Sequence, residues 1–194
     1  MGPTVASTQR TPLSASAPSP TIDPSDPAHW TISFDGVGPL TIDGSRSVEA
    51  QKVGSSYVRQ PDDYCQYSKP TVFLSSRSPT LWLRSGPSGT TSDAILEIAV
   101  GLEPEGRDAS IVSPRTAESI GIGSTETALK SAYPGMSYDP HPYFGATHYL
   151  VTDGVVLANG GQHYLLFVVT SGVVTGIVVQ RDTQYLYRYC EDQG

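Results

Sequence analysis

The longest apolar stretch of the chain runs from Tyr164 to Val179, and it constrains the fold more than any other feature. It is shorter than the ~20 residues that a membrane-spanning helix needs, and a polar segment, Thr170 to Gly172, interrupts its middle. A Ser-Gly connection between two runs rich in β-branched residues is typical of a tight β-hairpin. We therefore expect residues 163–170 and 173–180 to form paired antiparallel strands, and we expect no membrane span.

Shorter apolar segments, separated by Gly, Pro and Ser, continue this pattern along the chain. They predict further extended segments at residues 31–34, 40–42, 71–74, 80–84, 94–100, 119–122, 147–152 and 184–190. Two helices are expected at residues 45–53 and 124–133, with Ser45 and Ser124 as their N-caps. Gly and Pro together make 35 of the 194 residues and only 16% are charged, which argues against a helical bundle. The predicted fold class is α+β, an antiparallel sheet with two short helices.

The first 29 residues differ in composition from the rest of the chain. Pro, Ser, Thr, Ala and Gly fill 20 of the first 28 positions, and such a segment cannot bury enough apolar surface to offset its ordering entropy. We predict a disordered tether at residues 1–29 and a single domain at residues 30–194. A tether of this kind is typical of exported proteins and lipoproteins, with any lipid anchor upstream of the given chain. A disordered tail on a cytosolic protein is the alternative.

The domain shows signs of an internal duplication. The segment Leu40 to Ser45 aligns with Ile120 to Ser124 when one residue is gapped, and each precedes a helix, a loop and strands. The predicted halves are residues 30–105 and 106–194. Neither half would bury enough surface alone, whereas two units that share a core would. Chance similarity remains the alternative, because Gly-Ser before a helix is common.

This repeated motif resembles the tandem repeat of the beta-lactamase inhibitory protein family. It is also similar to actinobacterial exported proteins and lipoproteins of unknown function. The residues that carry the resemblance are Ile42, Gly44, Ser45 and Ala50 in the first half, and Ile122, Gly123, Ser124 and Leu129 in the second. The resemblance implies two consecutive helix-plus-sheet units. The inhibitor family has a disulfide within each repeat, whereas each half here has one Cys, so only the architecture is carried over, and no inhibitory contact residue.

The two cysteines, Cys65 and Cys190, exclude a structural zinc site, which needs more ligands of this kind. One disulfide between them would close a loop of more than 100 residues. In the chain-entropy model this loop closure stabilises the fold by about 4–5 kcal/mol. Two unrelated buried thiols are the alternative.

Several function classes find little support in the residues. The net charge of −7 offers no basic surface for a phosphate backbone, so we expect no nucleic-acid binding. The segment Gly121-Ile122-Gly123 lacks the third glycine of a dinucleotide site, and we expect no cofactor. Neither GxSxG nor SxxK occurs, so we assign no catalytic residue and expect a protein that is not an enzyme.

A metal site is a further hypothesis. His148 and His163 stand on neighbouring predicted strands, where they could join Asp139 or Asp153 as ligands. The histidines lack the fixed spacing of known motifs such as HExxH. We therefore assign no metal ligand.

Tyrosine is unusually frequent, with eleven residues against four phenylalanines. Its apolar ring and polar hydroxyl suit contact surfaces. The candidate partner surface consists of Tyr138, Tyr143, Tyr185, Tyr187 and Tyr189. In the predicted strand 184–190 the two-residue period places its three tyrosines on one face. These rings either form an outward platform for a protein or carbohydrate at the cell surface, or cover a small core.

Together these patterns predict a non-catalytic binding module with an unknown ligand, with an inhibitor-like module as its specific form, that is secreted or anchored to the outer face of the cell envelope. A secreted hydrolase whose catalytic site is not visible in the sequence is the first alternative. A structural envelope protein is the second.

Overall fold

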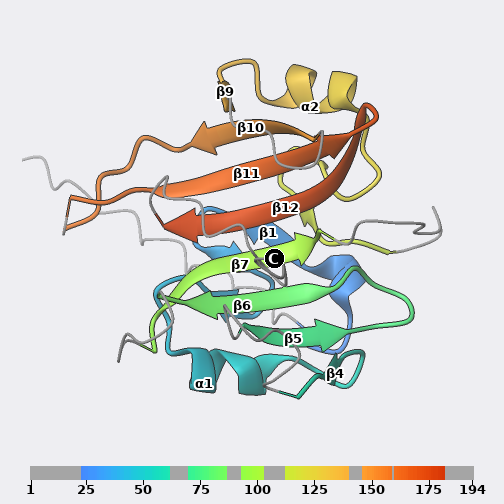
Figure 1. Ribbon diagram of the computed structural model, residues 1–194, viewed down its shortest axis with the longest axis vertical. Coiled ribbons are helices and arrows are strands. Elements are labelled where there is room, and N and C mark those ends of the chain that lie inside the picture. Colours follow the sequence, from blue (N-terminus) through green and yellow to red (C-terminus); the bar gives the residue numbers. More distant parts are fainter. Residues whose placement is uncertain are drawn as a thin grey trace, which may run out of the picture.

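The structure is a computed structural model that describes residues 23–61, 70–86, 93–102, 112–139, 146–158 and 160–181 (Figure 1). It confirms the predicted hairpin, in which β11 (His163–Thr170) pairs antiparallel with β12 (Val173–Arg181). Ser171 and Gly172 have φ angles of +52° and +76°. Two successive positive φ angles are the geometry of the type I′ turn, which matches the twist of the paired strands.

Among the described residues, the hairpin lies within a sheet of eight strands whose neighbouring strands are all antiparallel. Its strand order is β4-β5-β6-β7-β12-β11-β10-β9. The remaining strands are β4 (Val58–Arg59), β5 (Thr71–Leu74), β6 (Leu81–Ser85), β7 (Ile95–Gly101), β9 (Ser137–Asp139) and β10 (Thr147–Thr152).

A smaller sheet and two short helices complete the described part of the chain. The small sheet has the order β3-β2-β1-β8, and only its β1–β8 pair is parallel. Its strands are β1 (Thr31–Ser33), β2 (Gly36–Val37), β3 (Leu40–Thr41) and β8 (Arg115–Thr116). The helices are α1 (Arg46–Glu49), which continues into the 3-10 turn η2 (Ala50–Lys52), and α2 (Glu126–Ala132). The α+β class with two short helices is therefore confirmed.

The order of the large sheet has the same pattern from both edges, with two runs of four strands that meet at the β7–β12 pair. The first unit contains β2, β3, α1 and β4–β7, and the second contains β8, α2 and β9–β12. β7 and β12, the last strands of the two units, pair at the centre, and Figure 1 shows α1 and α2 at opposite ends of the sheet.

Equivalent hydrogen bonds fix the register between the units. The amide of Asp43 donates to the carbonyl of Ile95, and the amide of Gly123 donates to that of Val174, both at 2.9 Å. Asp43 and Gly123 both have positive φ, at +64° and +86°. The two segments thus align at an offset of 80 residues without a gap, and the one-residue gap in the sequence alignment was wrong. Ser45 corresponds to Thr125, not to Ser124.

The N-cap of α2 differs from the prediction by one residue, in line with the alignment without a gap. Thr125 is the N-cap of α2, where its Oγ1 accepts a hydrogen bond from the amide of Ala128 at 3.1 Å. Ser124, the predicted cap, instead accepts from the amide of Gly121. Ser45 does hold the N-cap position of α1, but its side chain makes no capping bond and donates to Asp93 at 2.6 Å.

One face of the large sheet packs against the small sheet and the helices. This main core contains apolar side chains from both units, among them Ile32, Leu40, Leu83, Ile98, Leu129, Phe167 and Ile177. A smaller cluster on the opposite face contains Val72, Trp82, Ala99, Leu166 and Val178. Because residues of both units fill the main core, the units bury their apolar surface together.

The structure describes residues 23–29 of the segment that composition assigned to the tether. A 3-10 turn, η1, spans Pro27–His29, and the indole of Trp30 donates to the carbonyl of Asp23 at 2.9 Å. Residues 1–22 lie outside the described residues. In the part of the chain that is described, no helix combines the length and the apolar character that crossing a membrane would require.

Candidate functional site

Of the predicted partner surface, the structure describes Tyr138. It lies on β9, which ends the strand order of the large sheet in the part of the chain that is described, and 58% of its surface is exposed. The other four predicted tyrosines, Tyr143, Tyr185, Tyr187 and Tyr189, lie outside the described residues, as do both cysteines, Cys65 and Cys190. The disulfide and the strand at residues 184–190 therefore stay predictions.

Tyr138 is held by a second tyrosine that the sequence analysis did not select. Tyr138 and Tyr149 are directly opposite each other in the β9–β10 pairing, and their rings meet edge to face with centroids 6.2 Å apart. Tyr149 is buried, its hydroxyl donates to Glu126, and Lys130 lies over its ring at 5.4 Å. We call these four residues, Tyr138, Tyr149, Glu126 and Lys130, the aromatic edge.

Hydrogen bonds set the charges within the aromatic edge. The hydrogen bond from Lys130, followed by the hydrogen bond from Tyr149, lowers the pKa of Glu126. The same bond to Glu126 raises the pKa of Lys130. Burial, followed by the bond to Glu126, raises the pKa of Tyr149. At neutral pH the carboxylate and the ammonium are both ionised and the phenol is neutral. The exposed ring of Tyr138 thus packs on a neighbour that is fixed by a charged pair.

The structure separates the two histidines of the metal hypothesis. His148 pairs with Val168 on β11, five residues from His163, which is about 17 Å along a strand. The odd separation also places the two on opposite faces of the sheet. The described residues contain no group of three or more His, Cys, Asp and Glu that could hold a metal ion.

His163 instead belongs to a cluster of charged residues. Its Nε2 lies 3.1 Å from Asp43 and its Nδ1 lies 3.6 Å from Asp35. Asp43 also pairs with Arg181 at 3.0 Å. Both ring nitrogens of His163 thus face carboxylates, whereas the base of a serine hydrolase faces a hydroxyl group with one of them. The cluster joins the loops around β3 to the central hairpin.

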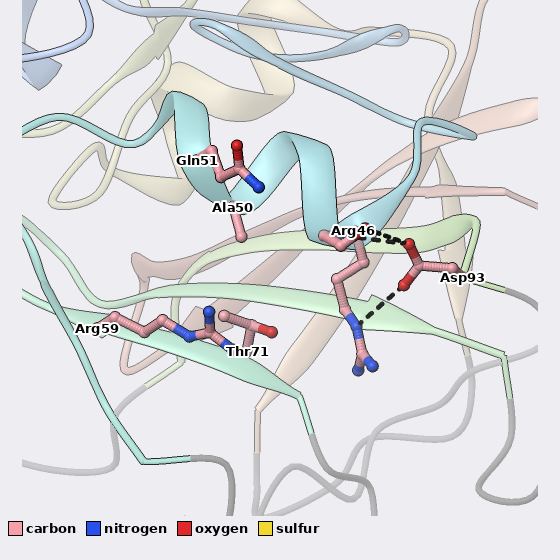
Figure 2. A pocket seen from close by; sticks show the side chains of 7 residues that line it. Arg46, Ala50, Gln51, Arg59, Thr71 and Asp93 are labelled. Atoms are coloured by element: carbon pink, nitrogen blue, oxygen red, sulfur yellow. Dashed lines mark hydrogen bonds and ion pairs between the residues drawn. The ribbon is translucent and has the colours of Figure 1, made fainter.

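A pocket that the sequence analysis missed lies at the other end of the large sheet. It has a volume of about 370 Å³ and opens between α1 and the β4–β5 edge. Figure 2 shows Arg46, Ala50 and Gln51 on the helical side, with Arg59 and Thr71 on the strands. No local sequence pattern marks this pocket, because its lining comes from a helix and two strands whose packing sets the opening.

Asp93 completes the lining and is firmly held. Its carboxylate accepts hydrogen bonds from the hydroxyls of Ser45 and Ser47 at 2.6 and 2.8 Å, and from the amide of Ser47 at 3.2 Å. Its other oxygen lies 3.7 Å from Nε of Arg46. These bonds, that from the hydroxyl of Ser45 first, lower the pKa of Asp93, so it is ionised at neutral pH.

Comparisons with protein-family models, with curated proteins and with solved structures found no match to this chain. The resemblance to the beta-lactamase inhibitory protein family therefore rests on the repeated motif alone. The functional argument rests on the two ends of the sheet, where the first unit has a charged pocket and the second has the aromatic edge.

Proposed function

We propose that the protein is a non-catalytic binding module of the cell surface, which contacts a protein or carbohydrate partner through the aromatic edge. The single observation that carries this proposal is the exposed ring of Tyr138, packed edge to face on the buried ring of Tyr149. An exposed aromatic ring that is already fixed loses little conformational entropy when a partner covers it.

The position of Tyr138 supports contact with a partner. β9 ends the strand order of the large sheet within the described residues, so its outer side is an edge at which a ligand can lie. Lys130, with a side chain that is 54% exposed, adds a hydrogen-bond donor beside the rings. Tyrosine is one of the residue types enriched at the energetic centres of protein interfaces.

Export forms part of the proposal. The composition of residues 1–22 is that of a spacer between a membrane or wall anchor and a folded domain. In this proposal the protein is secreted or attached to the outer face of the envelope, with any lipid anchor upstream of the given chain. The duplicated unit supports the resemblance to an inhibitor family, and an inhibitor-like or receptor-like role is the form of binding that we propose.

Replacement of Tyr138 tests the proposal. The immobilised chain is incubated with surface proteins and glycans of the source organism, and the captured molecules are compared with those captured by Tyr138→Ala. Val58→Ala is the matched control, since Val58 is 66% exposed on β4, the strand at the opposite edge. We expect Tyr138→Ala to lose a partner that the control retains, with a melting temperature within a few degrees of the wild type.

Equal capture by all three proteins would refute the role of the aromatic edge. Absence of any specific partner would instead favour the structural envelope protein. A photo-crosslinking residue at position 138 provides a second readout, because it labels the partner directly and identifies it as protein or glycan.

A further inference from the structure

The two units contain equivalent hairpins, β5–β6 in the first unit and β10–β11 in the second. The correspondence starts from Ile95 and Val174, which accept the equivalent hydrogen bonds, and passes across the strand pairings. The equivalent rows of opposed residues are Thr71–Leu83–Ile98 and Tyr149–Phe167–Ile177. The register shifts agree with this correspondence, because they follow Arg84 in one unit and Val168 in the other. The two hairpins can therefore be compared position by position.

The second hairpin is longer than the first by six residues. The last equivalent pairs that the register gives before the two connections are Phe73–Leu81 and Val151–Leu165. Residues 74–80 connect the first pair, and residues 152–164 connect the second. The first unit thus shows that this fold closes with the shorter connection. Loops carry binding residues more often than the elements they connect, so the longer connection is a candidate for a binding function.

The longer connection presents an apolar tip. Val155 and Val156 are neighbours in the loop that joins β10 to β11 (Figure 1), and they are 56% and 63% exposed. The sequence has no charged residue between positions 154 and 162. Single exposed apolar side chains are common on protein surfaces, whereas adjacent ones on an uncharged segment form a continuous apolar patch. We call the segment Gly154–Leu157 the valine tip.

Hydrogen bonds on both sides fix the backbone of the valine tip. On the side of β10, the amide of Val155 donates to the carboxylate of Asp153 at 2.9 Å. On the side of β11, the amide of Leu157 donates to the carbonyl of Gly161 at 2.8 Å. A loop that is held in this way loses little conformational entropy when a partner covers it.

The side chains of the tip suit a protein better than a glycan or a membrane. Valine has no hydrogen-bonding group for the hydroxyls of a sugar. Residues 153–162 include no Trp, Tyr, Lys or Arg, the residue types that anchor a segment at a membrane surface. The net charge of −7 also opposes binding to anionic lipids. We propose that the valine tip is a second interaction surface, which inserts its two valines into an apolar recess of a protein partner.

The valine tip is a site separate from the aromatic edge, and neither proposal depends on the other. A photo-crosslinking amino acid in place of Val156 tests it first. The full chain is irradiated with proteins released from the surface of the source organism, and the same crosslinker in place of Val58, which is 66% exposed on β4, is the control. We expect position 156 to label a protein that position 58 does not label. Labelling of glycan or lipid instead of protein, or no labelling, would overturn the proposal.

Affinities measured with the purified labelled protein connect the binding to the tip. The double variant Val155→Ser, Val156→Ser should bind this protein at least about tenfold more weakly than the wild type, because it removes apolar surface from the contact. Its melting temperature should stay within a few degrees of the wild type, since both side chains are exposed. Val58→Ser should retain the wild-type affinity. Equal affinity of the double variant and the wild type would refute the role of the tip.

Sedimentation with vesicles of phosphatidylcholine and phosphatidylglycerol distinguishes a protein partner from a membrane. We expect the wild-type chain to stay in the supernatant. Sedimentation of the wild type with the vesicles, together with loss of this binding in the double serine variant, would assign the tip to a lipid surface and overturn the proposal.

Shortening of the second hairpin provides a further test. In this variant the residues 153–162 are replaced by the sequence of Ser75–Ser78, which occupies the corresponding place in the first unit. The variant should fold, because these residues close the equivalent hairpin, and it should lose the protein partner. A folded shortened variant with wild-type affinity would contradict the proposal. If the variant does not fold, the affinity of the double serine variant decides.

Discussion

The buried ion pair between Arg84 and Glu97 should be one of the most sensitive points of the fold. The two residues are directly opposite each other on β6 and β7, with Nε of Arg84 2.8 Å from Oε2 of Glu97. Their side chains are only 7% and 4% exposed. Removal of one partner takes this ionic contact away from the other charge in a medium of low dielectric constant, and the loss of a buried ion-pair partner costs about 3–5 kcal/mol. We therefore expect Glu97→Gln to lower the free energy of unfolding by about that amount.

This loss is large enough to measure by several methods. For a chain of this length, about 1 kcal/mol corresponds to about 2–4 °C, so the melting temperature should fall by about 6–20 °C. Urea denaturation followed by circular dichroism gives the free energy directly. Lys130→Met, which breaks the exposed Lys130–Glu126 pair, is the control and should cost less than about 1 kcal/mol.

A double replacement separates the cost of an uncompensated charge from the value of the pair. In Arg84→Met with Glu97→Leu no charge remains at either position, so the stability should return to within about 1 kcal/mol of the wild type or exceed it. A loss below about 1 kcal/mol in Glu97→Gln would refute the reasoning. So would a double variant as unstable as the single one.

Two further predictions concern a glycine and a pH dependence. A Cβ atom at Gly36 would lie 1.9 Å from the carbonyl oxygen of Leu40, so Gly36→Ala should lower the free energy of unfolding by at least about 1–3 kcal/mol, measured by urea denaturation. Gly135 faces open space, so Gly135→Ala is the control and should change this free energy by less than about 0.5 kcal/mol. Equal effects of the two substitutions would count against the β2–β3 packing. The hydroxyl of Tyr133 lowers the pKa of Glu118 below its ordinary 4.5, so this contribution to stability is present above pH 4.5 and is lost as the pH falls further. Burial, and then Glu118, raise the pKa of Tyr133 above its ordinary 10, so its contribution is complete below pH 10 and is lost as the pH rises beyond it. Tyr133→Phe should reduce both slopes in unfolding measurements across pH, and unchanged slopes would contradict the pair.

The longer strands could be predicted from the sequence because local residue patterns mark where they begin and end. β5, β10 and β11 begin and end at the predicted residues, where apolar runs meet Gly, Pro, Ser or Asp. The strands β2, β4, β8 and β9 have only two or three residues and were missed. So short a segment has no periodicity, and its strand character comes from partners distant in the chain.

The candidate sites depend even more on distant contacts. The choice of Thr125 over Ser124 as helix cap follows from the bridge between Thr125 and Val173, since both residue types cap helices well. Tyr138 was selected from composition, but its support by Tyr149 required the β9–β10 register. The pocket joins a helix to two strands, so its lining depends on how these elements pack together.

The central claim is that two equivalent units share one core and therefore fold together. Both tryptophans, Trp30 and Trp82, lie in the N-terminal half, so their fluorescence reports on that side of the molecule. Leu129→Ala creates a cavity in the second unit, where Leu129 is fully buried, and should cost about 2–5 kcal/mol.

The most direct test is urea unfolding of Leu129→Ala, followed by tryptophan fluorescence and by far-ultraviolet circular dichroism in the same samples. A shared core predicts that both signals shift together, in one transition, by the full cost of the cavity. A fluorescence transition that stays at its wild-type position while the dichroism transition moves would show that the units fold separately, and would contradict the account.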